Sequence, residues 1–287
     1  MIGIPEEVLR EFELPDDSGY EKITNGYNSA TWVGHEFVIQ AVHSQSLEHH
    51  ESVLRITEEL RRTGAFPGLG FQKRPVVAEG AWWRISKRLD GPVANTLEPE
   101  THRLQILEDN LHSLLDDLNL LAGIDIGHMP EPSMSQNISG GELYHWLKAN
   151  RKEELTSLLQ NLSEEPRSKH VVAHGDALLK NMILSPKGVV IIDWESCQIM
   201  PRLYDPAHTV VQLLIGSSWG PPSQEEILWG LRLLKEASSY VGSSLNDREV
   251  TSLLAHALIR EAYLNPNDPK KLPKSTEILQ FLVSELS

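Results

Sequence analysis

The sequence predicts an α+β protein with two lobes: a small β-rich lobe over residues 1–88 and a larger, mainly helical lobe over residues 89–287. Two observations lead to this prediction. Short β-like runs separated by turn residues dominate the first part of the chain. After Leu89-Asp90-Gly91-Pro92 the apolar residues recur at helical spacing instead. With 287 residues, 40% of them hydrophobic, the chain is long enough for both lobes to have a core.

The first lobe is expected to be an antiparallel sheet that carries one helix, after a short N-terminal helix over residues 4–14. Pro5 and two glutamates in the first turn predict the short helix. Turn residues join the first three strands, which predicts a meander. Apolar residues at helical spacing predict the longer helix over residues 47–63. Strands are expected over residues 20–24, 30–33, 36–42, 76–79 and 81–87.

Capping signals and helical periodicity mark the helices of the second lobe. The segment 99–121 has an apolar stripe at helical spacing. Asp205-Pro206 has the residue types of an N-cap and a first-turn proline, for a helix through Ile215. Capping boxes at Ser139–Glu142, Ser223–Glu226 and Asn246–Glu249 precede helices expected to end near residues 149, 241 and 263. Further helices are expected over 152–162 and 275–286, and loops over 216–222 and 265–273.

The polar residues with chemical potential gather in one stretch of the second lobe, residues 171–195. In order, it contains His174, Asp176, Asn181, a Pro186-Lys187-Gly188 turn, the apolar run 189–192, Asp193 and Glu195. Two carboxylates and an amide at strand ends or in loops can share Mg²⁺, which prefers oxygen ligands. A carboxylate near an acceptor hydroxyl is what phosphoryl transfer from a nucleotide needs, and His174 is expected to orient the loop. The alternative is a turn whose Asp and Asn side chains only cap backbone groups.

The composition restricts the partners. The net charge of −14, from 26 basic and 40 acidic residues, argues against nucleic acid and anionic membranes as partners. It is compatible with a cationic substrate, although many proteins are simply acidic. The one cysteine, Cys197, excludes an internal disulfide framework. Because neither a signal peptide nor an apolar run of membrane-spanning length is visible, a cytoplasmic location is expected. The oligomeric state is not indicated.

The motif HGDALLKN followed by IIDWE resembles the aminoglycoside phosphotransferase and choline kinase family of kinase-like enzymes. The resemblance extends from about Tyr20 to Val241. It implies a bilobal, protein-kinase-like fold, ATP or GTP with Mg²⁺ as cofactors, and transfer of the γ-phosphate to a hydroxyl of a small polar or cationic acceptor. By matching residues, it also implies a catalytic role for Asp176 and His174, with Asp176 as the base. Asn181 and Asp193 match the metal ligands, and Glu195 would lie near the metal or a cationic group of the substrate.

The first lobe matches the family pattern less closely. Asn28 and Ser29 fall in a segment that resembles the phosphate-covering loop, although a plain hairpin turn is the preferred interpretation of this segment by itself. Lys87 and Leu89 belong to a segment that resembles the connector whose backbone pairs with the base of the nucleotide. Asp205 resembles a structural Asp of the family, but helix capping is the preferred interpretation.

The main departure from the family pattern is Gln40. Family members usually have a Lys at this place in the third strand, and its usual partner, a Glu on the helix, would be Glu51 or Glu58. Glutamine donates hydrogen bonds but brings no positive charge to the phosphates. Two alternatives follow: an enzyme with weaker or altered nucleotide use, or a degenerate kinase that binds nucleotide without catalysis.

Overall fold

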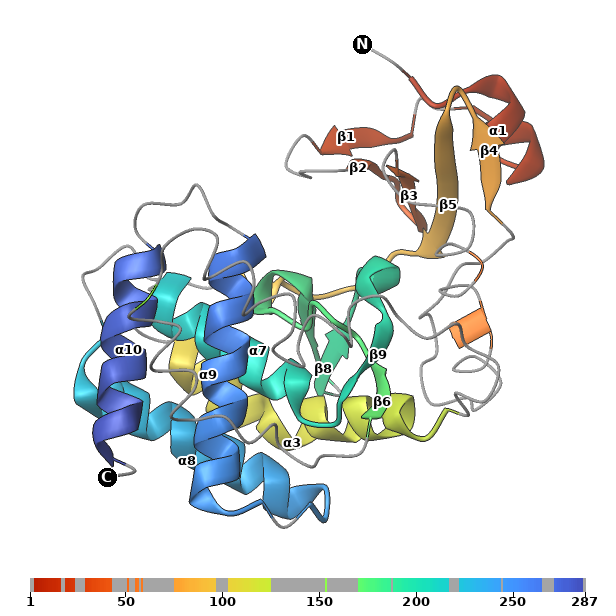
Figure 1. Cartoon of the computed structure of the whole chain (residues 1–287). Helices are drawn as coiled ribbons and strands as arrows, with labels where there is room; N and C mark the ends of the chain where they lie inside the picture. Colours follow the sequence, from red (N-terminus) through yellow and green to blue (C-terminus); the bar gives the residue numbers. More distant parts are fainter. Residues whose placement is uncertain are drawn as a thin grey trace. The chain divides into compact units, whose positions relative to one another are not determined.

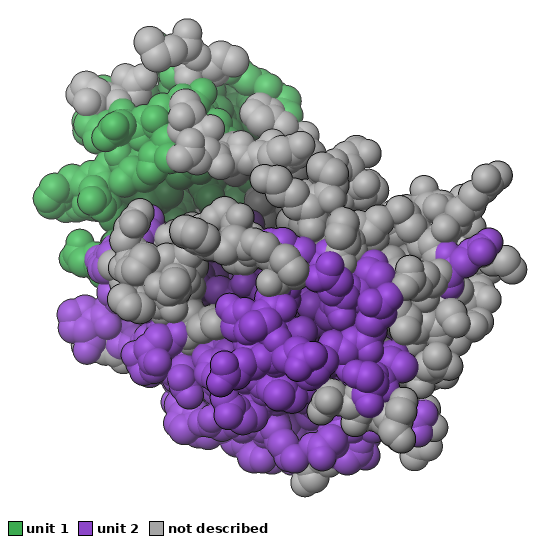
Figure 2. All heavy atoms as spheres, turned by 90° about the vertical axis from the view of Figure 1, so that its left-hand side faces the viewer, with its two compact units in different colours: residues 1–90 green, residues 91–287 purple. Residues whose placement is uncertain are grey.

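The computed structural model describes residues 3–16, 19–23, 29–42, 51, 55–56, 58, 75–96, 103–124, 153, 170–186, 188–216, 222–243, 245–264 and 271–285. The chain divides into two compact units, Met1–Asp90 and Gly91–Ser287 (Figures 1 and 2). The first is built on an antiparallel sheet and the second is mostly helical, so the predicted α+β class is confirmed.

The first unit contains a five-stranded antiparallel sheet with the strand order β1-β2-β3-β5-β4. Its strands are β1 (Glu21–Ile23), β2 (Ser29–Val33), β3 (Phe37–Val42), β4 (Val76–Ala78) and β5 (Ala81–Lys87). All five predicted strands are present, because short apolar runs bounded by turn residues are a local signal. Of the helix predicted over 47–63, the described residues Glu51, Arg55, Ile56 and Glu58 are helical, and Ile56 is buried.

The two faces of this sheet differ. Helix α1 (Glu6–Glu11) covers one of them, where Val8 packs into a core with Trp32, Ile39 and Trp83. The Trp32 and Trp83 rings lie 5.1 Å apart, centroid to centroid. Successive residues of a strand point to opposite faces, so Gln40, the neighbour of Ile39, points to the face that α1 does not cover.

The second unit contains five long helices in its described part: α3 (Arg103–Ala122), α7 (Tyr204–Gly216), α8 (Gln224–Tyr240), α9 (Asp247–Leu264) and α10 (Lys271–Glu285) (Figure 1). The apolar stripe of α3 is buried at Leu107, Leu111, Leu114, Leu115 and Leu118, as predicted. Helix α10 begins four residues before the predicted start, and Pro273 fits there because a first turn needs no donor from it. The helix predicted before residue 149 lies outside the described residues, and of 152–162 only Glu153, which is helical, is described.

The capping predictions for the second unit were right at two helices and wrong at a third. The Ser223 side chain accepts from the backbone N–H of Glu226, whose carboxylate accepts from the Ser223 N–H in return. Asn246 and Glu249 make the same reciprocal pair before α9. Asp205, in contrast, is no N-cap: α7 begins at Tyr204, and the Asp205 carboxylate accepts from a distant loop. None of the helices in the described ranges is long and apolar enough to cross a membrane.

Two short strand pairs position the polar stretch of the second unit. Strand β6 (His170–Ala173) pairs antiparallel with β9 (Gln198–Pro201), and β7 (Met182–Ser185) pairs with β8 (Gly188–Ile191) as the predicted hairpin. The hairpin docks on α3 through the backbone N–H of Val189, which donates to Ser113 Oγ at 3.1 Å. A side chain at Gly188 (φ 120°) would lie 2.3 Å from that same oxygen, so the position requires glycine.

Helix α3 also contains a carboxylate that we expect to destabilise the fold at neutral pH. Burial raises the pKa of Asp117 to about 7, and the neighbouring Asp116 carboxylate adds to the shift. A folded-state pKa above the unfolded value means that stability is lost as the pH rises through about 7. We therefore expect Asp117→Asn to raise the free energy of unfolding at pH 8. The full shift corresponds to about 4 kcal/mol, and partial solvent access reduces it to about 1–2 kcal/mol.

Urea unfolding at pH 8 and at a pH below 3.8 measures this gain, which should vanish at the lower pH because Asp117 is then mostly protonated in both states. Asp116→Asn is the matched control. Its carboxylate is exposed and accepts from Tyr240 Oη at 2.6 Å, so this variant should gain much less at pH 8. A destabilised Asp117→Asn variant at pH 8 would contradict the expectation.

Candidate active site

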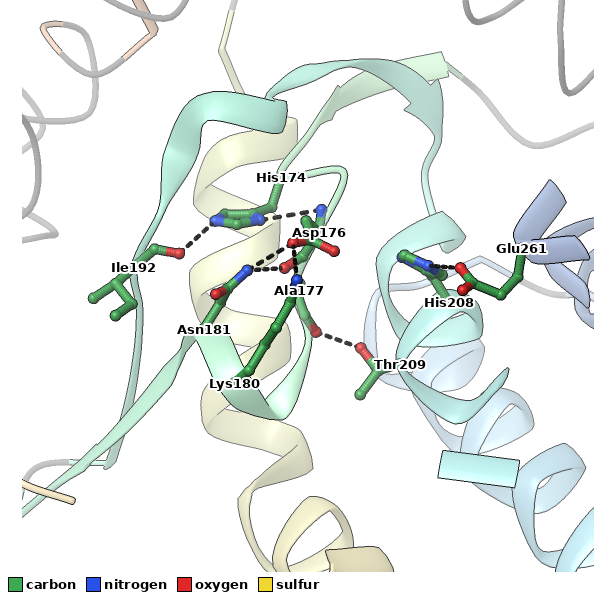
Figure 3. Close-up of polar contacts among 9 residues, drawn as sticks. All are labelled: His174, Asp176, Ala177, Lys180, Asn181, Ile192, His208, Thr209 and Glu261. Atoms are coloured by element: carbon green, nitrogen blue, oxygen red, sulfur yellow. Dashed lines mark hydrogen bonds and ion pairs between the residues drawn. The ribbon is translucent and has the colours of Figure 1, made fainter. Parts of the chain in front are cut away.

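The loop over residues 174–181 brings together three polar residues of the predicted active site, His174, Asp176 and Asn181. It follows β6 and ends in the short 3-10 helix Leu179–Asn181. Asn181 Nδ2 donates to the backbone oxygen of Asp176 at 2.8 Å and to its carboxylate Oδ2 at 2.9 Å (Figure 3). Asn181 is buried, whereas the Asp176 side chain is 23% exposed. The loop therefore presents one accessible carboxylate whose orientation is fixed by a buried amide.

His174 positions this loop. Its ring Nδ1 accepts from the backbone N–H of Asp176 at 3.3 Å, so Nε2 is the protonated nitrogen that donates to the backbone oxygen of Ile192 at 3.0 Å (Figure 3). Burial lowers the pKa of His174 to about 4, so the ring is neutral at neutral pH. Because both nitrogens are engaged with the backbone, the ring links Asp176 to the end of strand β8 and has no free atom for proton transfer.

Asp193 lies next to this loop because of the backbone before it. The N–H of Ile192 donates to the backbone oxygen of Asn181 at 2.8 Å, and Ile192 also accepts from His174. Asp193 itself has left-handed backbone angles (φ 66°, ψ 62°), a conformation that costs a non-glycine residue about 1 kcal/mol or more. It leads into the 3-10 turn Trp194–Ser196, where the Trp194 ring meets the His174 ring edge-on at 4.8 Å.

The residues predicted to bind Mg²⁺ have the donor atoms that this ion requires. The Asn181 amide nitrogen faces Asp176, so the amide oxygen is the atom left for a metal. Asp193 adds a carboxylate, and Mg²⁺ typically completes its shell with waters and phosphate oxygens. Groups of three or more His, Cys, Asp or Glu that could hold a metal are absent from the described residues. Glu195 lies in the turn after Asp193, with its side chain outside the described part.

Asp205 holds the loop from helix α7. Its Oδ2 accepts from the backbone N–H of His174 at 2.7 Å, and its Oδ1 accepts from that of Gly175 at 2.8 Å. Thr209, one turn later, donates its hydroxyl to the Ala177 oxygen at 2.5 Å (Figure 3). The same hydroxyl also donates to the backbone oxygen of Asp205 at 2.9 Å. Burial raises the pKa of Asp205 to about 6, although the two N–H donors oppose the shift. The helix-cap interpretation of Asp205 was therefore wrong, and this residue belongs to the support of the candidate site.

Two more contacts at the site were not expected from sequence. Lys180 Nζ lies 3.0 Å from Asp176 Oδ2, but it is 54% exposed, so the pair contributes about 1 kcal/mol or less. Behind the loop, His208 of α7 lies 3.2 Å from a carboxylate oxygen of Glu261 of α9, and both side chains are buried (Figure 3). This second pair joins the helix that carries Asp205 and Thr209 to its neighbour.

The residues predicted to bind the nucleotide fall in the first unit. Asn28 lies outside the described residues, and Ser29 begins β2. Gln40 is half-buried on β3, and Glu51 is helical and exposed. Lys87 is the last residue of β5, and Leu89 lies two positions after it. Lys87 pairs in register with Phe37 and Gln40 with Arg84. Arg84 and Lys87 are three positions apart on β5, an odd offset, so the side chains of Gln40 and Lys87 point to opposite faces of the sheet.

An antiparallel sheet unit followed by a helical unit with an HxDxxxxN loop and a following Asp is the arrangement of kinase-like phosphotransferases. The sequence model of the phosphotransferase enzyme family matches residues 21–233. Because this match covers most of the 287 residues, the chain belongs to that family. No curated protein matches the sequence.

Solved structures show the same fold. A thermostable mutant of aminoglycoside phosphotransferase APH(4)-Ia, in a ternary complex with ADP and hygromycin B, superposes with a TM-score of 0.66 at 14% identity over 98% of both chains. APH(2")-IIia, in complex with GDP and kanamycin, gives a TM-score of 0.63 at 14% identity over 97% of both chains. Aminoglycoside phosphotransferase APH(3'')-Id from Streptomyces rimosus gives 0.57 at 18% identity, over 85% of this chain and 93% of that one. These similarities establish the kinase-like fold.

Proposed function

We propose that the protein is a small-molecule kinase that transfers the γ-phosphate of ATP or GTP to a hydroxyl of a small polar or cationic acceptor. The observation that carries the proposal is the Asp176–Asn181 pair: an accessible carboxylate fixed by a buried amide, next to the backbone that delivers Asp193. Membership of the phosphotransferase enzyme family supports it.

The proposal assigns a role to each site residue of the second unit. Asp176 accepts the proton of the attacking hydroxyl, or orients that hydroxyl toward the phosphorus. The Asn181 oxygen and the Asp193 carboxylate would hold Mg²⁺, which would neutralise charge on the phosphates. His174 and Asp205 position the loop, and Glu195 is proposed to lie near the metal or a cationic group of the acceptor. Residues of the first unit, including Ser29, Gln40 and the connector with Leu89, bind the nucleotide.

The net charge of −14 supports a cationic acceptor, because an acidic protein attracts cations over a distance of about a Debye length. The solved relatives in complex with kanamycin and hygromycin B are in agreement with an acceptor of this class. A second function, nucleotide binding without catalysis, is favoured by one observation: Gln40 occupies the position where a Lys would neutralise the phosphates.

Turnover measured against a panel of acceptors separates the two functions. The protein is incubated with ATP or GTP, Mg²⁺, and aminoglycosides, macrolides, choline-like amines, homoserine or sugars, and phosphorylated product is detected by mass spectrometry. We expect acceptor-dependent product, and we expect removal of Mg²⁺ with a chelator to lower turnover by about 10²-fold or more, because the phosphate charge is then not neutralised.

Re-addition of Mg²⁺ after chelation is the control and should restore turnover. Tight, Mg²⁺-dependent nucleotide binding without product from any acceptor would favour the non-catalytic function. If neither ATP nor GTP binds, both proposals fail.

A further inference from the structure

The strand register places a buried arginine directly opposite Gln40. In the antiparallel pair of β3 and β5, Gln40 is the partner of Arg84, with Ile39 opposite Ile85 and Ala41 opposite Trp83 on either side. Directly paired residues on antiparallel strands have their Cβ atoms about 4.5–5.5 Å apart and point to the same face of the sheet. Arg84 and Gln40 are therefore neighbours on one face.

This face is not the one that α1 covers. The core beneath α1 contains Ile39, Trp83 and Ile85, the residues that flank Gln40 and Arg84 along their strands. Because side chains alternate along a strand, Gln40 and Arg84 both point away from that core. On this second face Gln40, Trp82 and Ser86 are only half-buried, whereas Arg84 is 2% exposed.

Arg84 has the positive charge for phosphate binding that Gln40 lacks. A guanidinium keeps its charge at any pH the protein meets, and its five N–H donors match phosphate oxygens in pairs. A buried cation is costly unless anionic or hydrogen-bonding groups face it. Arg84 has an interaction within the chain. Five donors allow it to keep that interaction and bind a phosphate as well.

We propose that Arg84 supplies, from strand β5, the positive charge that binds the α- and β-phosphates of the nucleotide, in place of a lysine at position 40. In this proposal the positive charge lies on β5 and not on the neighbouring strand β3. It lies on the same face of the sheet as the side chain of residue 40, and it binds the same phosphates. This inference rests on the proposed nucleotide-binding function, and it makes the absence of a lysine at position 40 compatible with an active enzyme.

The experiment compares the affinity for a nucleotide with the affinity for its nucleoside, since only the nucleotide has phosphates. Dissociation constants for ADP and adenosine, and for GDP and guanosine, are measured by calorimetry with Mg²⁺ present. We expect R84Q to weaken binding of the diphosphate by about tenfold to hundredfold, the range for hydrogen bonds to a charged group, and to leave nucleoside binding unchanged. Adding Q40K to R84Q should restore most of the diphosphate affinity, because a lysine at position 40 would return the charge to the same face.

K22Q is the matched control. Lys22 lies on the same sheet, but its ammonium is 5.0 Å from the ring of Trp32, a residue of the core on the opposite face. Removing this charge should change neither affinity. R84K keeps a charge in the buried position and covers the case in which R84Q does not fold; it should bind the diphosphate with intermediate affinity, and Q40K should improve it.

The outcomes separate the failure of this inference from the failure of the proposed function. A wild-type protein that binds none of the four probes overturns the proposed function. A wild-type protein that binds ADP or GDP, together with R84Q or R84K variants that keep the same ratio of diphosphate to nucleoside affinity, overturns the role of Arg84. A lower melting temperature with an unchanged ratio would mean that Arg84 is purely structural.

Discussion

Replacing Asp176 by asparagine is expected to lower kcat for phosphoryl transfer by about 10²- to 10⁴-fold, the usual contribution of a general base. The fold should be preserved, because an asparagine oxygen at this position can still accept from Asn181 Nδ2, as Asp176 Oδ2 does at 2.9 Å. The affinity for nucleotide should change little, since Asp176 is proposed to act on the acceptor hydroxyl. Steady-state kinetics with the best acceptor, together with circular dichroism and thermal unfolding, measure all three quantities.

Asp247→Asn provides the control for this variant. Asp247 also forms an ion pair with a lysine, Lys235 at 2.5 Å, but it lies exposed in the first turn of α9. The Asp247→Asn substitution removes the same charge and the same kind of ion pair as Asp176→Asn, but outside the 174–181 loop. The kcat of this control should therefore equal that of the wild type. An Asp176→Asn variant with wild-type kcat would show that the 174–181 loop does not carry the reaction.

The parts of this fold that sequence could predict are those with local causes. The strands of the first unit are bounded by turn residues close in sequence, and the reciprocal caps at Ser223 and Asn246 involve residues three positions apart. The geometry of Asp176 and Asn181 follows from a spacing of five residues within one loop. In each case the deciding interaction lies within a short window of the chain.

The interactions that sequence reasoning missed connect distant positions. Asp205 was assigned to its own helix, because an Asp followed by Pro is a good helix start, yet its partners are the N–H groups of residues 174 and 175. The proximity of Arg84 to Gln40 depends on the register between β3 and β5, two strands that lie far apart in the sequence, and no local signal specifies this register. The signal that could have revealed both is a charged residue inside an otherwise apolar segment, since such a residue needs a partner.

Asp205 is the second position where a substitution should have a large effect. Asp205→Ala leaves the buried N–H groups of His174 and Gly175 without an acceptor, at a cost of about 1–3 kcal/mol each. We expect the free energy of unfolding to fall by about 2–6 kcal/mol. We also expect kcat to fall by about 10- to 100-fold, because the loop that positions Asp176 loosens. Urea unfolding and steady-state kinetics on the soluble variant test the two effects, and a wild-type kcat would show that the loop does not depend on Asp205.

The wild-type pH profile tests the same contacts without a mutation. Burial raises the pKa of Asp205 to about 6, and a protonated carboxyl is a weaker acceptor for the two N–H groups, so kcat should fall as the pH drops through about 6. The free energy of unfolding should not fall in parallel with kcat over this pH range. The raised pKa of Asp205 favours folding as the pH falls below about 6, whereas the pKa of His174, lowered to about 4, disfavours folding as the pH falls below its unfolded value of 6.5. The two contributions oppose one another between pH 4 and 6, each with a magnitude of about 3 kcal/mol.

Two threonines distinguish a loosened loop from a general loss of stability. Thr209 and Thr251 are both buried, and each donates its hydroxyl to the backbone oxygen four residues earlier in its helix, at 2.9 Å and 2.7 Å. Only Thr209 also donates to the 174–181 loop, at Ala177. Replacing either residue by valine keeps the shape and removes the hydroxyl, at a cost of about 1 kcal/mol. If Asp205 and Thr209 act through the loop, kcat should fall in Thr209→Val and stay at the wild-type value in Thr251→Val. Equal losses of activity in the two variants would mean that the loss in Asp205→Ala reflects stability alone.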